Sequence, residues 1–175
     1  MTHRFQYVVA FIFILAAAMS RLLPHLPNFT PIAALGLFGG VYFNKKFATI
    51  VPLAALVISD YVIGFHSLIG WVYGSFLAIS LMGMWLKNHK SAGTIAWTTL
   101  AGSVLFFIVT NFGVWVSGYY PHTVDGFIAC YVAAIPFFRN TLAGDFFYVT
   151  VLFGSYELVR YFVMKQTASL QSVSH

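Results

Sequence analysis

Apolar runs long enough to cross a membrane recur from one end of this chain to the other, with short polar breaks between them. A helix needs about 20 apolar residues to cross a hydrocarbon core roughly 30 Å thick. The composition agrees, because 60% of the residues are hydrophobic and only 7% are charged, too few to cover a soluble globule. We therefore expect an all-α, polytopic integral membrane protein, with one domain over residues 1–168 and a polar tail over residues 169–175.

The polar breaks divide the chain into six predicted transmembrane helices, of which the second is short. The apolar segment Phe127–Phe138, with about 12 residues, is too short to cross alone. We expect it to form a re-entrant or interfacial helix before the last span. The predicted bounds of the six helices are Phe5–Leu23, Pro31–Phe43, Phe47–Ile63, Trp71–Leu86, Thr94–Ser117 and Arg139–Val163.

The segment Arg21–Gly40, with the sequence RLLPHLPNFTPIAALGLFGG, joins the first two predicted helices. Prolines end the first helix, and Thr30 followed by Pro31 is typical of an N-cap and the first residue of the next helix. This second helix covers only about 20 Å, so we expect its N-terminus to start below the outer surface and to face a cavity. Gly36 and Gly40 form a G-x-x-x-G pair that would allow another helix to approach closely.

The positive charges indicate an orientation for these helices. With the N-terminus inside, most of the nine Lys and Arg residues fall on the cytoplasmic side, as in the positive-inside pattern. We therefore expect an inner (cytoplasmic) membrane protein with both termini in the cytoplasm and with Arg21 and Arg139 outside. The residues placed inside are Arg4, Lys45, Lys46, Lys87, Lys90, Arg160 and Lys165.

Several function classes are not indicated by the sequence. The net charge of +5 comes from basic residues scattered singly or in pairs, which does not favour a nucleic-acid partner. The chain has one cysteine, Cys130, so no internal disulfide is possible. It contains no G-x-x-x-x-G-K-[ST], C-x-x-C or H-E-x-x-H motif. We expect no cofactor and no catalytic residues.

With the predicted orientation, most polar residues of the spans and loops fall at or near the outer side. Ionisable residues within spans are costly in lipid, so we expect them to face one another or a water-filled cavity. Arg139 could form a structural ion pair with Asp60 or with Asp145, or these three could contact a ligand. The predicted substrate-binding residues are Arg21, His25, Asn28, Thr30, Asp60, His66, Asn111, Trp115, Tyr120, Arg139, Asn140 and Asp145.

Some of these residues also have a purely structural interpretation. Arg21 could anchor a carboxylate or phosphate of a solute, or could be a charge at the end of a helix. Asn28 is also typical of a turn, and Trp115 of the aromatic belt at a membrane surface. His66 could ligate cobalt or be a turn residue. Cys130 could likewise ligate cobalt or be a small buried hydrophobe.

Three segments resemble an uncharacterised family of membrane transport proteins that is often grouped with the S-components of energy-coupling factor (ECF) vitamin transporters. They read SRLLPHLPNFTPIAALGLFGG, VPLAALVISDYVIGFH and CYVAAIPFFRNTLAGDFFY, and the resemblance covers about Ser20 to Tyr156. It implies binding of a vitamin or related micronutrient, with cobalamin among the candidates. It also implies transfer to a transmembrane subunit with two ATPases, docked near Ala16–Ser20, or uptake without them.

The principal hypothesis is therefore an outward-facing protein in the lipid bilayer that binds a small solute and is gated by movement of its outer loops. One alternative is a structural or assembly protein whose polar cluster only stabilises helix packing. Another is an intramembrane hydrolase in which Asp60 and Asp145 share a proton. Gly144 and Asp145 supply only half of the G-x-G-D motif of such enzymes.

Overall fold

The computed structural model describes residues 3–24 and 26–173, and this part of the chain contains α-helices and no strand. The all-α prediction is confirmed, and α1 to α5 coincide with the first five predicted helices to within a few residues. The helices are α1 (His3–Leu22), α2 (Ile32–Tyr42), α3 (Lys45–Ile63), α4 (Ile69–Leu86), α5 (Ala92–Val116) and α6 (Val124–Val173).

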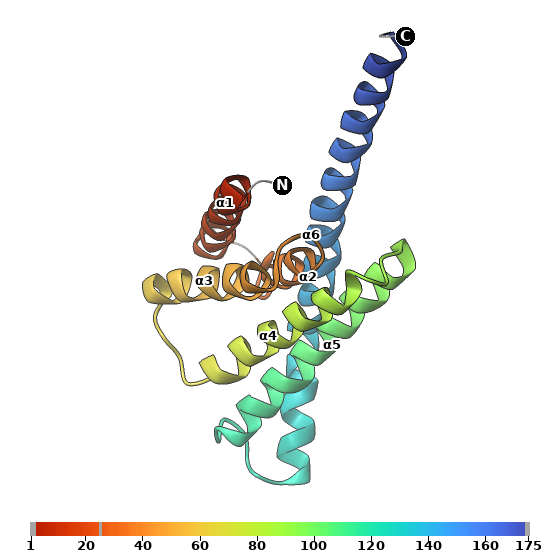
Figure 1. The fold of residues 1–175 in the computed structure, drawn as a ribbon. Coiled ribbons are helices and arrows are strands. Elements are labelled where there is room, and N and C mark those ends of the chain that lie inside the picture. The colour runs from red at the N-terminus through yellow and green to blue at the C-terminus, as the bar shows by residue number, and fades with distance from the viewer. Residues whose placement is uncertain (1–2, 25, 174–175) are drawn as a thin grey trace.

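The short helix α2 lies at the centre of the fold, where it contacts α3, α4, α5 and α6 (Figure 1). Every residue from Ile32 to Val41 is buried. A helix that is apolar on all sides is typical of a position enclosed by other helices. The remaining helices pack around it, with α1 against the outer side of α3 and with α5 between α4 and α6.

Glycines allow α2 and α4 to approach at backbone distance. A Cβ atom on Gly40 would lie 2.2 Å from the carbonyl carbon of Gly83, and one on Gly83 would lie 2.7 Å from the carbonyl oxygens of Gly36 and Leu37. Any side chain at Gly40 or Gly83 would therefore push the helices apart. The predicted role of the G-x-x-x-G pair in close helix approach is confirmed.

Side-chain caps define the starts of two long helices. Asn44 accepts a hydrogen bond from the Phe47 N–H (3.0 Å) at the start of α3, and Ser91 accepts one from the Thr94 N–H (3.0 Å) at the start of α5. Each cap satisfies a backbone N–H that has no partner within the helix. Asn44 is followed by Lys45 and Lys46, and Ser91 follows Lys90, so polar turn residues mark both starts in the sequence.

The start of α2 differs from the prediction, because Pro31 and not Thr30 occupies the N-cap position and no side chain caps the helix. The Pro31 carbonyl accepts the first helical hydrogen bond, from the Leu35 N–H at 2.9 Å. Thr30 therefore lies one residue too early for its hydroxyl to cap the first turn. The predicted Thr30 cap is wrong, and Thr30 instead lines a cavity.

The last helix is also longer than predicted. Phe127–Phe138 is not a re-entrant segment but the first part of α6, which continues through Arg139 and past Val163 to Val173. The predicted break is wrong because no helix terminator follows Phe138. Pro136 removes one backbone hydrogen bond but does not end the helix. This part of α6 packs on α5, where the Phe107 ring contacts those of Tyr131 and Phe138.

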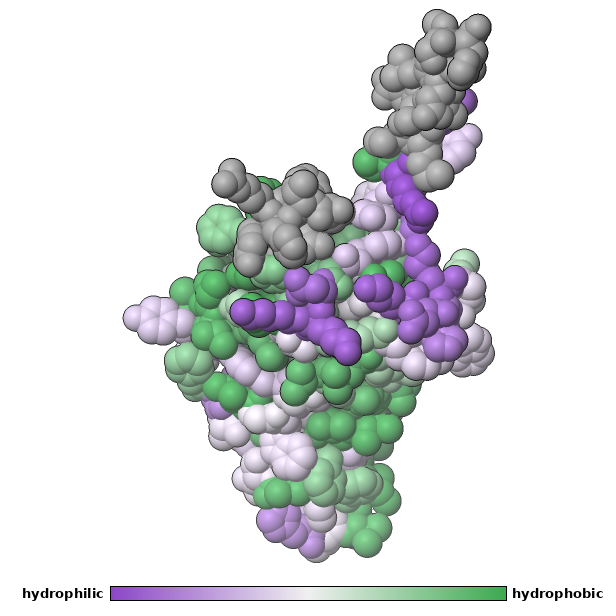
Figure 2. Space-filling view, in the orientation of Figure 1, coloured by the Kyte–Doolittle hydropathy of each residue, from purple (hydrophilic) through white to green (hydrophobic). Residues whose placement is uncertain are grey.

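Four helices are long and apolar enough to cross a membrane: α3, α4, α5 and the Val124–Phe162 part of α6. The Phe11–Leu22 part of α1 and the whole of α2 are shorter apolar helices. Figure 2 shows a mostly apolar surface below a belt of hydrophilic residues that crosses the upper part of the visible face. These features are those of a membrane-embedded helical protein.

Candidate functional site

Two adjoining cavities lie at the end of the molecule where α1, α3 and α5 finish and α2, α4 and α6 begin. The first cavity has a volume of about 350 Å³ and the second about 360 Å³. Asn28, Val72, Phe106 and Thr141 line both of them, so the two cavities share a wall. Three connections meet there: the α1–α2 linker, the α3–α4 turn and the α5–α6 loop.

Most of the predicted substrate-binding residues line these cavities. They are contributed by helices and by all three connections, although they are far apart in the sequence. Their gathering at one end of the molecule is as predicted, and their role in binding stays a prediction. The lining residues from the predicted set are Arg21, Asn28, Thr30, His66, Asn111, Tyr120 and Asp145.

Asn28 is in the left-handed backbone region, with a φ of 64°. Asparagine is one of the few residues other than glycine that adopt this conformation readily. The turn interpretation of Asn28 is therefore confirmed. Because the same residue lines both cavities, the turn also places a side-chain amide in their shared wall.

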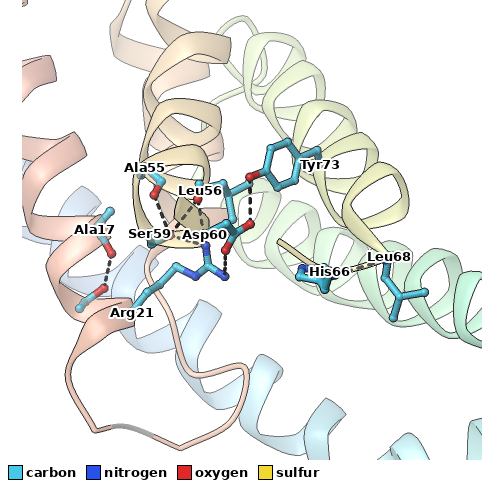
Figure 3. A network of polar contacts seen from close by, with 10 residues as sticks. Ala17, Arg21, Ala55, Leu56, Ser59, Asp60, His66, Leu68 and Tyr73 are labelled. Atoms are coloured by element: carbon cyan, nitrogen blue, oxygen red, sulfur yellow. Dashed lines mark hydrogen bonds and ion pairs between the residues drawn. The ribbon is translucent and has the colours of Figure 1, made fainter. Parts of the chain in front are cut away.

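A charged network joins α1, α3 and α4 beside the first cavity (Figure 3). Arg21 Nη2 lies 2.8 Å from Asp60 Oδ1, and Arg21 also donates a hydrogen bond to the Ser59 hydroxyl. From the other side, the Tyr73 hydroxyl donates to Asp60 Oδ2 at 2.9 Å. Asp60 is only 1% exposed, so its charge is balanced within the protein. Its predicted pairing with Arg139 is wrong.

Asp145 has a different partner from the one predicted. Its Oδ2 accepts a hydrogen bond from the Ser103 hydroxyl at 2.6 Å. Arg139 is exposed on α6, and neither Arg139 nor the half-buried Asn140 lines a cavity. The predicted pair of Arg139 with Asp145 is wrong because, six residues apart on one continuous helix, the two side chains point to different faces.

Trp115 lies in the last turn of α5, where it contacts the α5–α6 loop and lines neither cavity. Its Nε1 donates a hydrogen bond to the Pro121 carbonyl at 3.0 Å, and its ring centroid lies 5.3 Å from that of His122. Trp115 thus holds the loop against the end of α5. The predicted binding residue His25 lies outside the described residues.

Sequence reasoning missed Ser59, Tyr73 and Ser103, which are the hydrogen-bond partners of Arg21 and the two aspartates. Serine in an apolar helix gives little signal, because its hydroxyl often bonds to a carbonyl of the preceding turn. The Ser103 oxygen also lies 3.1 Å from the Thr99 carbonyl oxygen, one turn earlier on α5.

No metal centre is evident in the part of the chain that the structure describes, where no three His, Cys, Asp or Glu side chains lie together. His66 lines the first cavity and Cys130 the second. The two residues predicted as candidates for cobalt ligation therefore line different cavities. The Nδ1 of His66 accepts a hydrogen bond from the Leu68 N–H at 3.2 Å, which assigns its proton to Nε2 in the neutral ring.

A second charged network, which the sequence did not indicate, lies at the opposite end of α2. Glu157 of α6 pairs with Lys90 and accepts a hydrogen bond from the Tyr42 hydroxyl at 2.6 Å. Partial burial lowers the pKa of Lys90, but its hydrogen bonds with Glu157 and Tyr42 outweigh this, so the pKa is raised above its ordinary value. This network ties α2 to α6 and to the α4–α5 turn.

These observations define a class, a membrane-embedded helical protein with cavities at one end that are lined partly by polar residues, and with a basic, hydrophilic opposite end. The chain belongs to the Family of unknown function (DUF6580), whose model matches residues 1–168. A comparison with curated proteins finds no match, and neither does a comparison with solved structures.

Proposed function

We propose that the protein is an integral membrane solute-binding and uptake protein of the S-component type, which captures a vitamin or related micronutrient from the outer side. In this proposal α1 and α2 complete six transmembrane helices, and both termini lie in the cytoplasm of a cell bounded by this inner membrane. The observation that carries the proposal is the pair of adjoining cavities, which polar residues from three separate connections line. Such cavities with a few convergent polar groups are typical of small-molecule sites.

The basic residues support the proposed orientation. The contact of Lys90 with Tyr42 and Glu157 brings the α4–α5 turn, the end of α2 and α6 together at the end opposite the cavities. Lys45 and Lys46, the first two residues of α3, are exposed at the same end. By the positive-inside rule this end faces the cytoplasm, so the cavities open towards the outside.

The volumes favour a compact solute. Pockets for small molecules commonly have volumes of about 300–1,000 Å³, and each of these cavities is at the small end of that range. A compact micronutrient therefore suits the site better than cobalamin with its large corrin ring. His66 and Cys130 would then act as wall residues of the cavities and not as cobalt ligands.

The two connections nearest the opening are joined by a hydrogen bond, which suggests how access is gated. The Ser67 and Tyr119 hydroxyls lie 3.0 Å apart, so the α3–α4 turn is tied to the α5–α6 loop. Breaking one exposed hydrogen bond costs little. Separation of these two connections is therefore our proposed route by which a solute enters.

The burial of the small-residue segment Ala16–Ser20 decides how much of it a transmembrane subunit could contact. Ala17 and Ala18 are buried, at 1% and 3% exposure, so only part of this segment is available to a transmembrane subunit. This favours uptake without an ECF-type subunit and its ATPases. A hydrolase is not favoured, because Asp60 binds Arg21 and Tyr73 while Asp145 binds Ser103, whereas a shared-proton pair needs the two carboxyl groups in contact.

A cavity-filling variant tests the proposal. Ala33 lines the first cavity and is buried, so Ala33→Phe should occupy part of the space that a solute needs. Ala96→Phe is the matched control, because Ala96 is exposed on α5 and lines neither cavity. Mass spectrometry of small molecules released from the purified proteins should detect one solute with the wild type and with Ala96→Phe, and a loss of at least about tenfold with Ala33→Phe.

The structural or assembly alternative predicts a different result. If no solute is released from the wild type, and if a panel of vitamins leaves its thermal midpoint unchanged, the uptake proposal is wrong. Equal amounts of solute from all three proteins would place binding elsewhere than in the first cavity. Size-exclusion profiles of the three proteins would show that the variants are folded.

A further inference from the structure

The first cavity contains a buried acid that has no charged partner. Asp145 lines the cavity and is 4% exposed, and the Ser103 hydroxyl is its hydrogen-bond donor. Among the ion pairs of the described residues, none includes Asp145. An ionised carboxylate in such a place is costly unless a positive charge compensates it.

Among the described residues of the lining, the other titratable groups do not supply this positive charge. Arg21 is the cation of this described lining, but it is committed to Asp60, at 2.8 Å, on the side of α3. His66 uses its Nδ1 to accept the Leu68 N–H. With Arg21 balanced by Asp60, the ionised form of Asp145 leaves the cavity with one uncompensated negative charge.

The remaining walls suit an organic cation. Phe76 and Phe106 line the same cavity, with ring centroids 5.0 Å apart, and aromatic faces attract ammonium groups. The Thr30 and Thr141 side chains also line it and carry hydroxyl oxygens that can accept hydrogen bonds. A volume of about 350 Å³ is far larger than a single metal ion requires.

We propose that the first cavity binds the positively charged ammonium group of an organic solute, with Asp145 as its counter-charge. This inference rests on the proposed function and names the chemical class of its solute. Ser103 orients the carboxylate from behind, and the solute nitrogen replaces the missing cation. The Arg21–Asp60 pair then acts as a neutral wall and does not compete for the solute.

Three probes of similar size and different charge test the inference: phenethylamine, phenethyl alcohol and phenylacetate. Their affinities for the detergent-purified protein are measured from the rise in its thermal midpoint with probe concentration. Phenethylamine should bind at least about tenfold more tightly than the other two, as a charge-assisted contact predicts. Asp145→Asn should lose this preference, whereas Asp125→Asn, at an exposed acid on the same helix, should keep it.

A second measurement uses the wild-type Asp145 side chain and so does not depend on whether Asp145→Asn folds. Dicyclohexylcarbodiimide modifies carboxyl groups in apolar surroundings, and peptide mass spectrometry reports which acid has reacted. Phenyltrimethylammonium, a cation that the activated carboxyl group cannot acylate, should slow the modification of Asp145 in the wild-type protein, and phenethyl alcohol should not.

Tighter binding of the alcohol or of phenylacetate would overturn the inference while leaving solute binding intact. Stabilisation by sodium or potassium ions but by none of the probes would also overturn it, as would the absence of any probe binding. Release of a co-purified solute that carries no positive charge would separate failure of this inference from failure of the proposed function.

Discussion

A charged network lies near each end of α2, but the surroundings of the two networks differ. Beside the first cavity, the side chains of Arg21 and Asp60 are 17% and 1% exposed. At the opposite end, those of Lys90 and Glu157 are 29% and 42% exposed. Each network joins three parts of the chain, so the two have a similar architecture and differ mainly in their access to water.

Because of this difference in burial, we expect the two networks to contribute different amounts to the free energy of unfolding. Removing one member of a buried pair leaves a charge that water cannot reach, whereas an exposed charge is rehydrated. The buried network is therefore the one that fixes the shape of the cavity wall. The exposed network adds a weaker connection between α2 and α6 at the hydrophilic end.

The largest expected effect comes from removing Asp60. Asp60→Ala leaves the Arg21 guanidinium without its counter-charge, and we expect the free energy of unfolding to fall by about 3–5 kcal/mol. Denaturation by sodium dodecyl sulfate in mixed micelles measures this change. Asp125→Ala is the control, since Asp125 is exposed in the first turn of α6, and there we expect a loss of at most about 1 kcal/mol.

Replacement of both charges sharpens the same test. The double variant Arg21→Met/Asp60→Leu should recover most of the stability that Asp60→Ala loses, because apolar groups of similar volume can replace a buried pair at little cost. If the single and double variants are equally unstable, the loss reflects packing and not an unpaired charge.

The next largest effect is expected at the glycine contact between α2 and α4. Gly83→Ala forces a Cβ to within 2.7 Å of α2 backbone oxygens, and we expect overpacking to cost about 1–3 kcal/mol. Gly74 lies on the same helix, and a Cβ added there would meet nothing within 4 Å. Gly74→Ala should therefore be neutral or stabilising by about 0.5–1 kcal/mol. Similar changes in the free energy of unfolding for Gly83→Ala and Gly74→Ala would argue against close packing of α2 on α4.

The smallest effect is expected at the exposed network. Glu157→Gln should lower the free energy of unfolding by at most about 1 kcal/mol. The difference from the wild type should shrink further at 1 M salt, where the Debye length is only about 3 Å. A loss as large as that of Asp60→Ala would remove the distinction between the two ends of α2.

Much of the fold follows from the sequence because apolar runs and polar turns define helices directly. Asn44 and Ser91 show this well, since each polar residue before an apolar run is an observed cap. The continuity of α6 could not be predicted in the same way. Whether a helix passes through Pro136 depends on packing against α5, which has no local signature.

The sequence predicts where the candidate site lies better than it predicts which side chains contact one another there. Polar residues such as Asn28, His66 and Asp145 stand out in an apolar chain, and all three line the cavities. Their partners could not be deduced, because the choice between Arg21 and Arg139 for Asp60 depends on which helix faces are turned towards each other. Glu157 was overlooked since its position near the end of an apolar run is also typical of a solvated residue.

The central claim is that the cavity end faces outward and the end with the basic turns faces the cytoplasm. Single cysteines at His66 and at Lys46, each in a Cys130→Ala background, test it in intact cells with a membrane-impermeant maleimide. His66→Cys should react from outside, and Lys46→Cys only after the cells are permeabilised. Reaction of both cysteines from the same side, or reaction of Lys46→Cys alone in intact cells, would contradict the account.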